Sequence, residues 1–282
     1  MKCTKCGAEV SECLDNCSTC RTYAGAPNVR FAEKTVHQNA LNARYNDALQ
    51  IAKANGTHNE LSHFDGAMKK TFAVINVDIK KLYDFITDDS MIYSTYHLQV
   101  EGESRIPAVF EDDSQRRRVE AILFASYGKH IRYAALSYDK KGLTSYGPYS
   151  MTLREISIEA RATLLENNSY PFLDKHNIIK STDVPDGFCS TWGERHKLAV
   201  AKLHDRILST TTEAQYAKIL LESEGKRPTD EFIEVHIYGG FDNKAIESVT
   251  GISKGVYKNP ERGMLPVIKK VLKKKGITWI EQ

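Results

Sequence analysis

Residues 232–240 read Phe-Ile-Glu-Val-His-Ile-Tyr-Gly-Gly. Ile233, Val235 and Ile237 alternate with polar residues, which is the period-two pattern of a β-strand, and the glycine pair marks its end. The same alternation places Glu234 and His236 on one face of the strand, with Phe232. A carboxylate in such a strand is costly unless it faces water, a partner or a cleft. Glu234 is therefore a candidate functional residue, although an edge strand with one polar face would also explain it.

Other strands are expected on both sides of this one along the chain, together with helices that have apolar stripes. We predict strands at residues 72–77, 93–100, 131–138, 149–154, 156–164 and 277–280. Helices are expected at residues 28–55, 79–86, 115–127, 195–208, 213–223 and 265–275, whereas residues 57–70 have the composition of a loop. This order of elements predicts an α+β fold.

The N-terminus carries two Cys-x-x-Cys pairs. Cys3 and Cys6 form the first, and Cys17 and Cys20 form the second. Each pair makes a tight turn that directs two sulfurs to one point, and two such turns complete the tetrahedron that zinc prefers. Four thiolates leave no open coordination position, so we expect a structural zinc ion. Cys13 lies between the pairs and could replace Cys17, but it has no partner two residues away.

Composition places the chain among ordinary globular proteins. It has 282 residues, of which 41% are hydrophobic and 27% are charged, with a formal net charge of +3. The longest apolar runs are far shorter than the ~20 residues that a bilayer requires, so no membrane association is expected. Six cysteines and no apolar signal segment favour a reducing compartment, and we expect a cytoplasmic protein.

Several short motifs resemble the bacterial ADP-ribosyltransferase-fold toxins. Residues 146–154 (Tyr-Gly-Pro-Tyr-Ser-Met-Thr-Leu-Arg), 161–163 (Arg-Ala-Thr) and 168–169 (Asn-Ser) look like the central strands of that family. Residues 232–240 look like its strand with the catalytic glutamate. The resemblance extends from about residue 93 to the C-terminus. It implies an ADP-ribosyltransferase-like split β-sandwich core of two small packed sheets with flanking helices, preceded here by a small zinc ribbon.

The resemblance also implies roles for individual residues. Glu234 would be the catalytic glutamate, holding a ribose hydroxyl of NAD and stabilising the oxocarbenium-like transition state. His97 would hold the NAD ribose or phosphate, and Arg105 is the alternative for that role. Tyr146 could stack on nicotinamide, and Thr163 and Ser169 would brace the site.

Two departures from the family pattern bear on the substrate. The central strand has no Ser-Thr-Ser triplet, and Phe232 stands where many protein-modifying members have Gln or Glu. The second departure disfavours an arginine in a protein as the acceptor. The zinc ribbon, the arginine run at residues 116–118 and the lysines near the C-terminus favour nucleic acid, RNA or DNA. The resemblance further implies a bacterial toxin or antiphage effector with an antitoxin partner.

The sequence therefore predicts three parts: a zinc ribbon at residues 1–25, a helical connector at residues 28–70 and a catalytic domain at residues 71–282. Three alternatives stay open. The acceptor could be a protein. The chain could be a non-catalytic zinc-ribbon adaptor that binds nucleic acid. It could also be a hydrolase that uses Cys189 or the helix face with His196 and His204.

Overall fold

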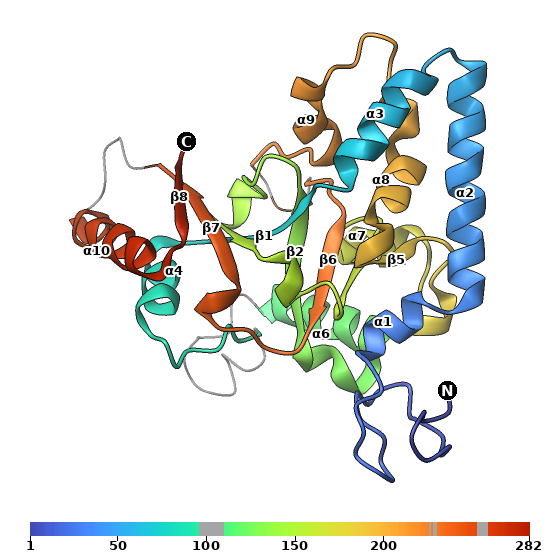
Figure 1. Ribbon diagram of the computed structural model, residues 1–282, viewed down its shortest axis with the longest axis horizontal. Helices are drawn as coiled ribbons and strands as arrows, with labels where there is room; N and C mark the ends of the chain where they lie inside the picture. The colour runs from blue at the N-terminus through green and yellow to red at the C-terminus, as the bar shows by residue number, and fades with distance from the viewer. Residues whose placement is uncertain (96–109, 226, 228–229, 253–258) are drawn as a thin grey trace.

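A single eight-stranded β-sheet forms the centre of the computed structural model (Figure 1). The structure describes residues 1–95, 110–225, 227, 230–252 and 259–282. The strand order is β5-β4-β6-β2-β1-β3-β7-β8, and every neighbouring pair is antiparallel except β7 and β8. The strands are β1 (Phe72–Val77), β2 (Ile131–Ser137), β3 (Tyr149–Leu153), β4 (Ala162–Leu165), β5 (Cys189–Thr191), β6 (Glu234–Tyr238), β7 (Ile246–Gly251) and β8 (Thr278–Glu281).

The fold is thus mixed α and β, as predicted, but its strands share one hydrogen-bonded sheet and do not form two separate small sheets. The helices are α1 (Pro27–Ala32), α2 (Thr35–Ala54), α3 (His58–Met68), α4 (Ile79–Thr87), α6 (Phe110–Phe124), α7 (Ser169–Lys175), α8 (Arg195–Leu203), α9 (Tyr216–Leu220) and α10 (Asn259–Lys275). Short 3-10 turns join several of them.

The register of the strands separates the sheet into two chemically different faces. Residues that lie opposite each other on paired strands point to the same side. Glu234 lies opposite Ala135 and Leu165, and the same row continues through Val74 to Thr152 and Ser248. We call this side the polar face. Its polar residues are Asn76, Tyr133, Ser137, Ser150, Thr152, Thr163, Glu234, His236, Ser248 and Thr250.

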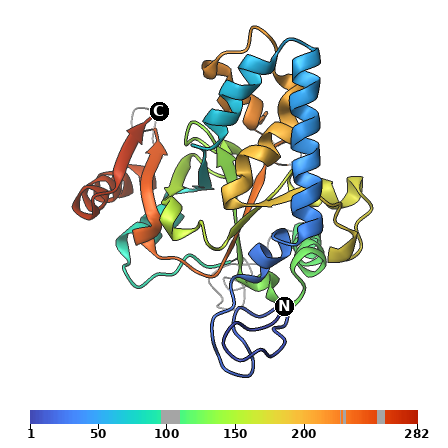
Figure 2. The same cartoon turned by 45° about the vertical axis from the view of Figure 1, so that its right-hand side comes forward.

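The opposite side, the apolar face, forms the main hydrophobic core. Ile75, Met151 and Val249 form one row of it, and Ala134, Val235 and Leu164 form another. Helices α2, α3 and α8 pack together over one part of this core, and α4 and α10 pack on each other over the other part (Figures 1 and 2). Helix α4 begins after Asp78, because the Asp78 side chain caps the helix by accepting a hydrogen bond from the Lys81 amide.

The polar face is covered by different elements. Helix α1 contacts β4, β5 and β6, and α6 packs on α7 over the same end of the sheet. The chain between β2 and β3 folds back onto β1, where the Asn76 side chain binds the Lys141 and Gly147 carbonyls. Gly142 has φ +58°, and a Cβ there would lie 2.3 Å from Asn76 Oδ1, so this close approach requires glycine.

Several predicted elements differ from the observed ones. Residues 58–68, expected as a loop, form α3, because Leu61, Phe64 and Met68 recur at helical spacing and are buried in the core. Helix α6 begins at Phe110, before the expected start, so the arginines at 116–118 lie inside the helix and not at its N-terminus. Residues 156–161 are a turn before β4, and the strands β5 and β7 were not anticipated. Most of the expected strand at 93–100 lies outside the described residues.

Candidate functional site

The four predicted zinc ligands come together at the N-terminus. The sulfurs of Cys3, Cys6, Cys17 and Cys20 all lie within 4.8 Å of one another. Cys3 and Cys20 Sγ are 3.6 Å apart, and Cys6 and Cys17 Sγ are 3.7 Å apart. Zinc–sulfur bonds of about 2.3 Å at tetrahedral angles require a sulfur–sulfur separation of roughly 3.8 Å. The cluster therefore has the dimensions of a site that could hold a metal such as zinc.

The two cysteine pairs have nearly the same backbone geometry. The Gly7 amide donates to the Cys3 carbonyl, and the Arg21 amide donates to the Cys17 carbonyl, both at 2.9 Å. Gly7 and Arg21 both have positive φ, +73° and +60°. Each pair is thus a tight turn with one left-handed residue, which directs its two sulfurs toward the centre.

Cys13 does not belong to the cluster. It packs against the aromatic residues Phe124 and Tyr127, which lie at the end of α6 and in the turn after it. Arg30 of α1 binds the segment between the two cysteine pairs. Its Nη2 donates hydrogen bonds to the carbonyls of Ser11, Glu12 and Leu14. The cysteine cluster is therefore a compact unit attached to α1 (Figure 2).

The second candidate site is on the polar face and centres on Glu234. Only 7% of this residue is exposed. Its Oε2 accepts a hydrogen bond from the Ser169 amide at 3.0 Å and lies 2.9 Å from His236 Nε2. Both of these contacts go to Oε2.

Two tyrosines lie beside this carboxylate. Burial raises the pKa of Tyr146 to about 12, and the charge of Glu234 adds to the effect. Burial likewise raises the pKa of Tyr133 well above its usual range, with contributions from the charges of Glu120 and Glu234. Tyr133 lies opposite His236 on the neighbouring strand. Tyr146 packs against a small cluster that includes Ala135, the residue opposite Glu234. The two phenols therefore remain neutral hydrogen-bond donors near Glu234.

Two exposed arginines stand over these tyrosines. Arg116 Cζ is 5.9 Å from the centre of the Tyr133 ring, and Arg227 Cζ is 4.7 Å from that of Tyr146. A buried carboxyl group thus lies among aromatic rings, with guanidinium groups on the outside. Such a site can bind a ligand that carries a positive charge at one end and phosphates farther out.

The structure places most of the other predicted site residues near Glu234. Ser169 is 4% exposed, and its backbone amide donates to Glu234. Thr163 lies opposite His236 on β4, and its hydroxyl accepts a bond from Asn28 Nδ2 at 3.1 Å. Asn28 Nδ2 also donates to the carbonyls of Arg161 and His236. Predicted residues His97 and Arg105 lie outside the described residues.

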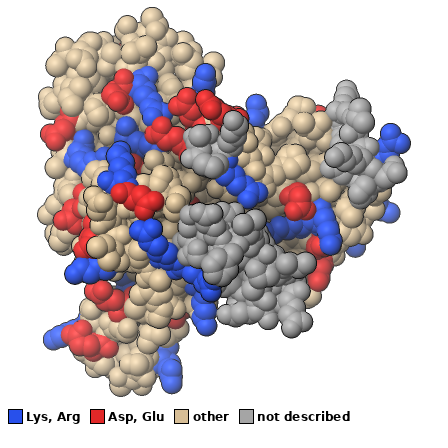
Figure 3. Space-filling model, turned by 180° about the vertical axis from the view of Figure 1, so that it is seen from behind, with Lys and Arg blue, Asp and Glu red and all other residues tan. Residues whose placement is uncertain are grey.

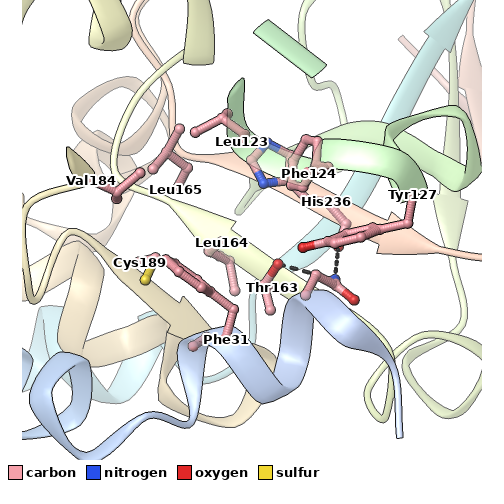
Figure 4. Close-up of a pocket in the computed structure, with 12 residues that line it drawn as sticks. Phe31, Leu123, Phe124, Tyr127, Thr163, Leu164, Leu165, Val184, Cys189 and His236 are labelled. Carbon is pink, nitrogen blue, oxygen red and sulfur yellow. Dashed lines mark hydrogen bonds between the residues drawn. The ribbon is translucent and has the colours of Figure 1, made fainter. Parts of the chain in front are cut away.

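A small cavity lies behind the site, between α1 and α6 (Figure 4). It has a volume of about 30 Å³ and is lined by Phe31, Phe124, Tyr127, Leu165 and His236, among others. The cavity is therefore too small for a nucleotide.

The alternative centre at Cys189 is a buried thiol. The thiol is 7% exposed, and burial raises its pKa to about 12, with a further contribution from Asp186. Thiolate is the reactive form, so almost none is present at neutral pH. On the nearby helix, burial lowers the pKa of His196, and His204 Nδ1 lies 3.3 Å from the Ala201 carbonyl. This region therefore gives no support to a cysteine hydrolase.

Comparison with known proteins does not place the chain in a family. A scan against protein-family models finds no match, and a search of curated proteins finds none either. Among the described residues, no helix is both long and apolar enough to cross a bilayer.

Proposed function

We propose that this protein is an NAD-dependent mono-ADP-ribosyltransferase with Glu234 as its catalytic carboxylate. The observation that carries the proposal is the environment of Glu234: a buried carboxylate held through one oxygen by Ser169 and His236, between Tyr133 and Tyr146. The reaction breaks the bond between the nicotinamide nitrogen and the ribose C1 atom. Positive charge then develops on the sugar, and a fixed carboxylate in a water-poor site stabilises it.

The surroundings of Glu234 suit the rest of NAD. The nicotinamide ring of NAD is cationic, and a neutral tyrosine face attracts a cation. Tyr146 is the ring we assign to it. Arg116 and Arg227 are placed to bind the two phosphates, because guanidinium groups form paired hydrogen bonds with phosphate oxygens. His236 keeps Glu234 oriented with Oε1 toward the ribose.

We propose nucleic acid, RNA or DNA, as the acceptor. Lys270, Lys273 and Lys274 on α10 are exposed, whereas Lys269 and Lys275 pair with Glu281 and Asp89. The N-terminal segment with the cysteine cluster lies at the bottom of the views in Figures 1 and 2 and α10 at their left edge, so together they would contact a long polymer and not one short segment. Elsewhere acidic and basic side chains are interspersed, as on the face in Figure 3.

We assign a structural zinc ion to the cysteine cluster, because four thiolates would occupy every position of a tetrahedral site. Thiolate ligands survive in a reducing compartment, and a cytoplasmic toxin or antiphage effector is the setting we propose. An enzyme that modifies nucleic acid would damage its own cell, so a protein antitoxin is the partner we propose.

The test is incubation of the full chain with adenine-labelled NAD and total bacterial RNA, DNA and protein in separate reactions. We expect label in RNA or DNA with the wild type and none with Glu234→Ala. Label in protein alone would show that the acceptor is a protein and would leave the proposed transferase activity in place. Nucleic-acid binding that survives Glu234→Ala, with NAD left intact by the wild type, would support the zinc-ribbon adaptor instead.

A further inference from the structure

His236, the partner of Glu234, is held through both its ring and its backbone. Its Nε2 lies 2.9 Å from Glu234 Oε2. The rings of Phe124 and Tyr133 meet the imidazole edge-on, with ring centres 4.9 and 5.4 Å away. The His236 carbonyl accepts a hydrogen bond from Asn28 Nδ2 at 3.0 Å. The orientation of the Glu234–His236 pair therefore depends on elements outside β6 as well as on the strand itself.

Asn28 on α1 bridges two neighbouring strands at this point. It is 4% exposed. Besides the His236 carbonyl, its Nδ2 lies 3.1 Å from Thr163 Oγ1 and 3.1 Å from the Arg161 carbonyl (Figure 4, dashed lines). Thr163 on β4 lies opposite His236 on β6. One side-chain amide thus connects β4 and β6 at the position of His236.

The helix that carries Asn28 is bound to the cysteine ribbon. Two residues after Asn28, Arg30 Nη2 donates to the carbonyls of Ser11, Glu12 and Leu14 at 2.6 to 3.3 Å. These carbonyls lie in the segment between the two Cys-x-x-Cys turns, and both turns must form to fix that segment. The contacts of Arg30, and with them the support of α1, therefore require a folded ribbon.

The same segment of the ribbon supports the other side of His236. Cys13 packs against the buried cluster of Phe124, Tyr127 and Ile131. Phe124 is also one of the two rings that contact the imidazole of His236. The ribbon thus reaches His236 by two contacts, one through α1 to its backbone and one through the end of α6 to its ring.

We propose that the folded cysteine cluster positions His236, and through it Glu234, with Asn28 as the positioning residue. This role goes beyond the proposed function, because it holds for any reaction that Glu234 serves. Loss of the metal would unfold the ribbon, since metal binding supplies the folding free energy of such a module. Arg30 would then lose its three carbonyl acceptors, and Phe124 would lose the contact with Cys13. Strand β6 would stay in the sheet, because β2 and β4 pair with it on both sides.

The experiment observes the pair directly by NMR of the full chain labelled with 15N-histidine, with zinc bound and after a strong chelator. The ring signals of His236 are those that His236→Gln removes. We expect chelation to move the Nε2 signal, because its shift depends on the contact with Glu234. Amide exchange in residues 234–238 should rise about 5-fold, as expected for the loss of one hydrogen bond that holds the strand.

Two substitutions locate the connection. Arg30→Gln should move the His236 signal in the direction that chelation does, with zinc still bound. Arg154→Gln is the matched control, because Arg154 Nε also donates to a carbonyl, that of Lys244, and this bond touches neither the ribbon nor His236. It should give the wild-type signal.

Asn28→Ala tests the positioning residue itself. It should move the His236 signal with zinc bound, and chelation should then add a smaller change than it does in the wild type, because the two changes share one contact. Equal effects of chelation in the two proteins would exclude Asn28 as the connection.

Two further results would overturn the proposal. One is an unchanged His236 signal after chelation while the ribbon amides exchange freely. The other is an equal rise in amide exchange in β1 and β3, which would show a general loss of stability and not local positioning. If Asn28→Ala does not fold, Arg30→Gln takes its place, because Arg30 is half-exposed and lies outside the sheet. A wild-type His236 signal in that variant would reject the role of α1.

Discussion

The two faces of the sheet differ in what their residues do. On the apolar face, rows such as Ile75, Met151 and Val249 are buried in one continuous core under helices. On the polar face, Glu234 and His236 bind each other, and hydroxyls such as that of Thr152 are buried without a hydrogen-bond partner among the described residues. The apolar face therefore provides stability. Burying polar groups without partners on the polar face lowers the stability of the fold, and a functional role of this face would explain why they are there.

Metal removal should produce the largest local effect. Binding of a structural zinc ion contributes about 10 kcal/mol to folding of such a module, so a strong chelator or Cys17→Ser should unfold residues 1–25. The sheet should stay folded, because its core is made of other residues. Amide hydrogen exchange of the ribbon, together with fluorescence of Trp192 and Trp279 in the main body, separates the two responses. Loss of the tryptophan signal on chelation would show that the sheet also depends on the metal.

A substitution that creates a cavity on the apolar face should have the next largest effect on stability. Ile237 is fully buried in the main core, and Ile237→Ala removes three carbon atoms there. We expect the free energy of unfolding to fall by about 3 kcal/mol, measured by urea denaturation. A change below about 1 kcal/mol would contradict the assignment of this face as the source of stability.

The matched substitution on the polar face should have a small effect of opposite sign. Thr152 is fully buried, and its hydroxyl has no hydrogen-bond partner within the described part of the chain. Thr152→Val keeps the shape and removes the unsatisfied group, so we expect a gain of about 1 kcal/mol in the free energy of unfolding. Destabilisation by more than about 1 kcal/mol would mean that this hydroxyl has a partner in solution.

The sequence predicted the metal cluster and Glu234 for different reasons. The Cys-x-x-Cys spacing is local, so the ligand geometry follows from two short turns. Glu234 was recognisable because a carboxylate interrupts an apolar strand, and the alternation already placed His236 beside it. Asn28 could not be found this way, because only the tertiary fold brings it to the strand.

The strands β5 and β7 were missed for a related reason. β5 has only three residues, too few for a period-two pattern, and β7 comes directly after a 3-10 turn at Asn243–Ala245. The residues of β7 become a strand through pairing with β3. Long-range pairing of this kind overrides local preference.

The most direct test of the central claim is the rate of nicotinamide release from NAD by the wild type and by Glu234→Gln, with circular dichroism as the check on folding. The glutamine keeps the size of the side chain and removes the charge that would stabilise the sugar cation. We expect release by the wild type and a loss of about 100-fold or more in the folded variant. Equal rates in the two proteins, or intact NAD with the wild type in the presence of cell RNA, DNA and protein, would contradict the assignment of Glu234 as the catalytic carboxylate.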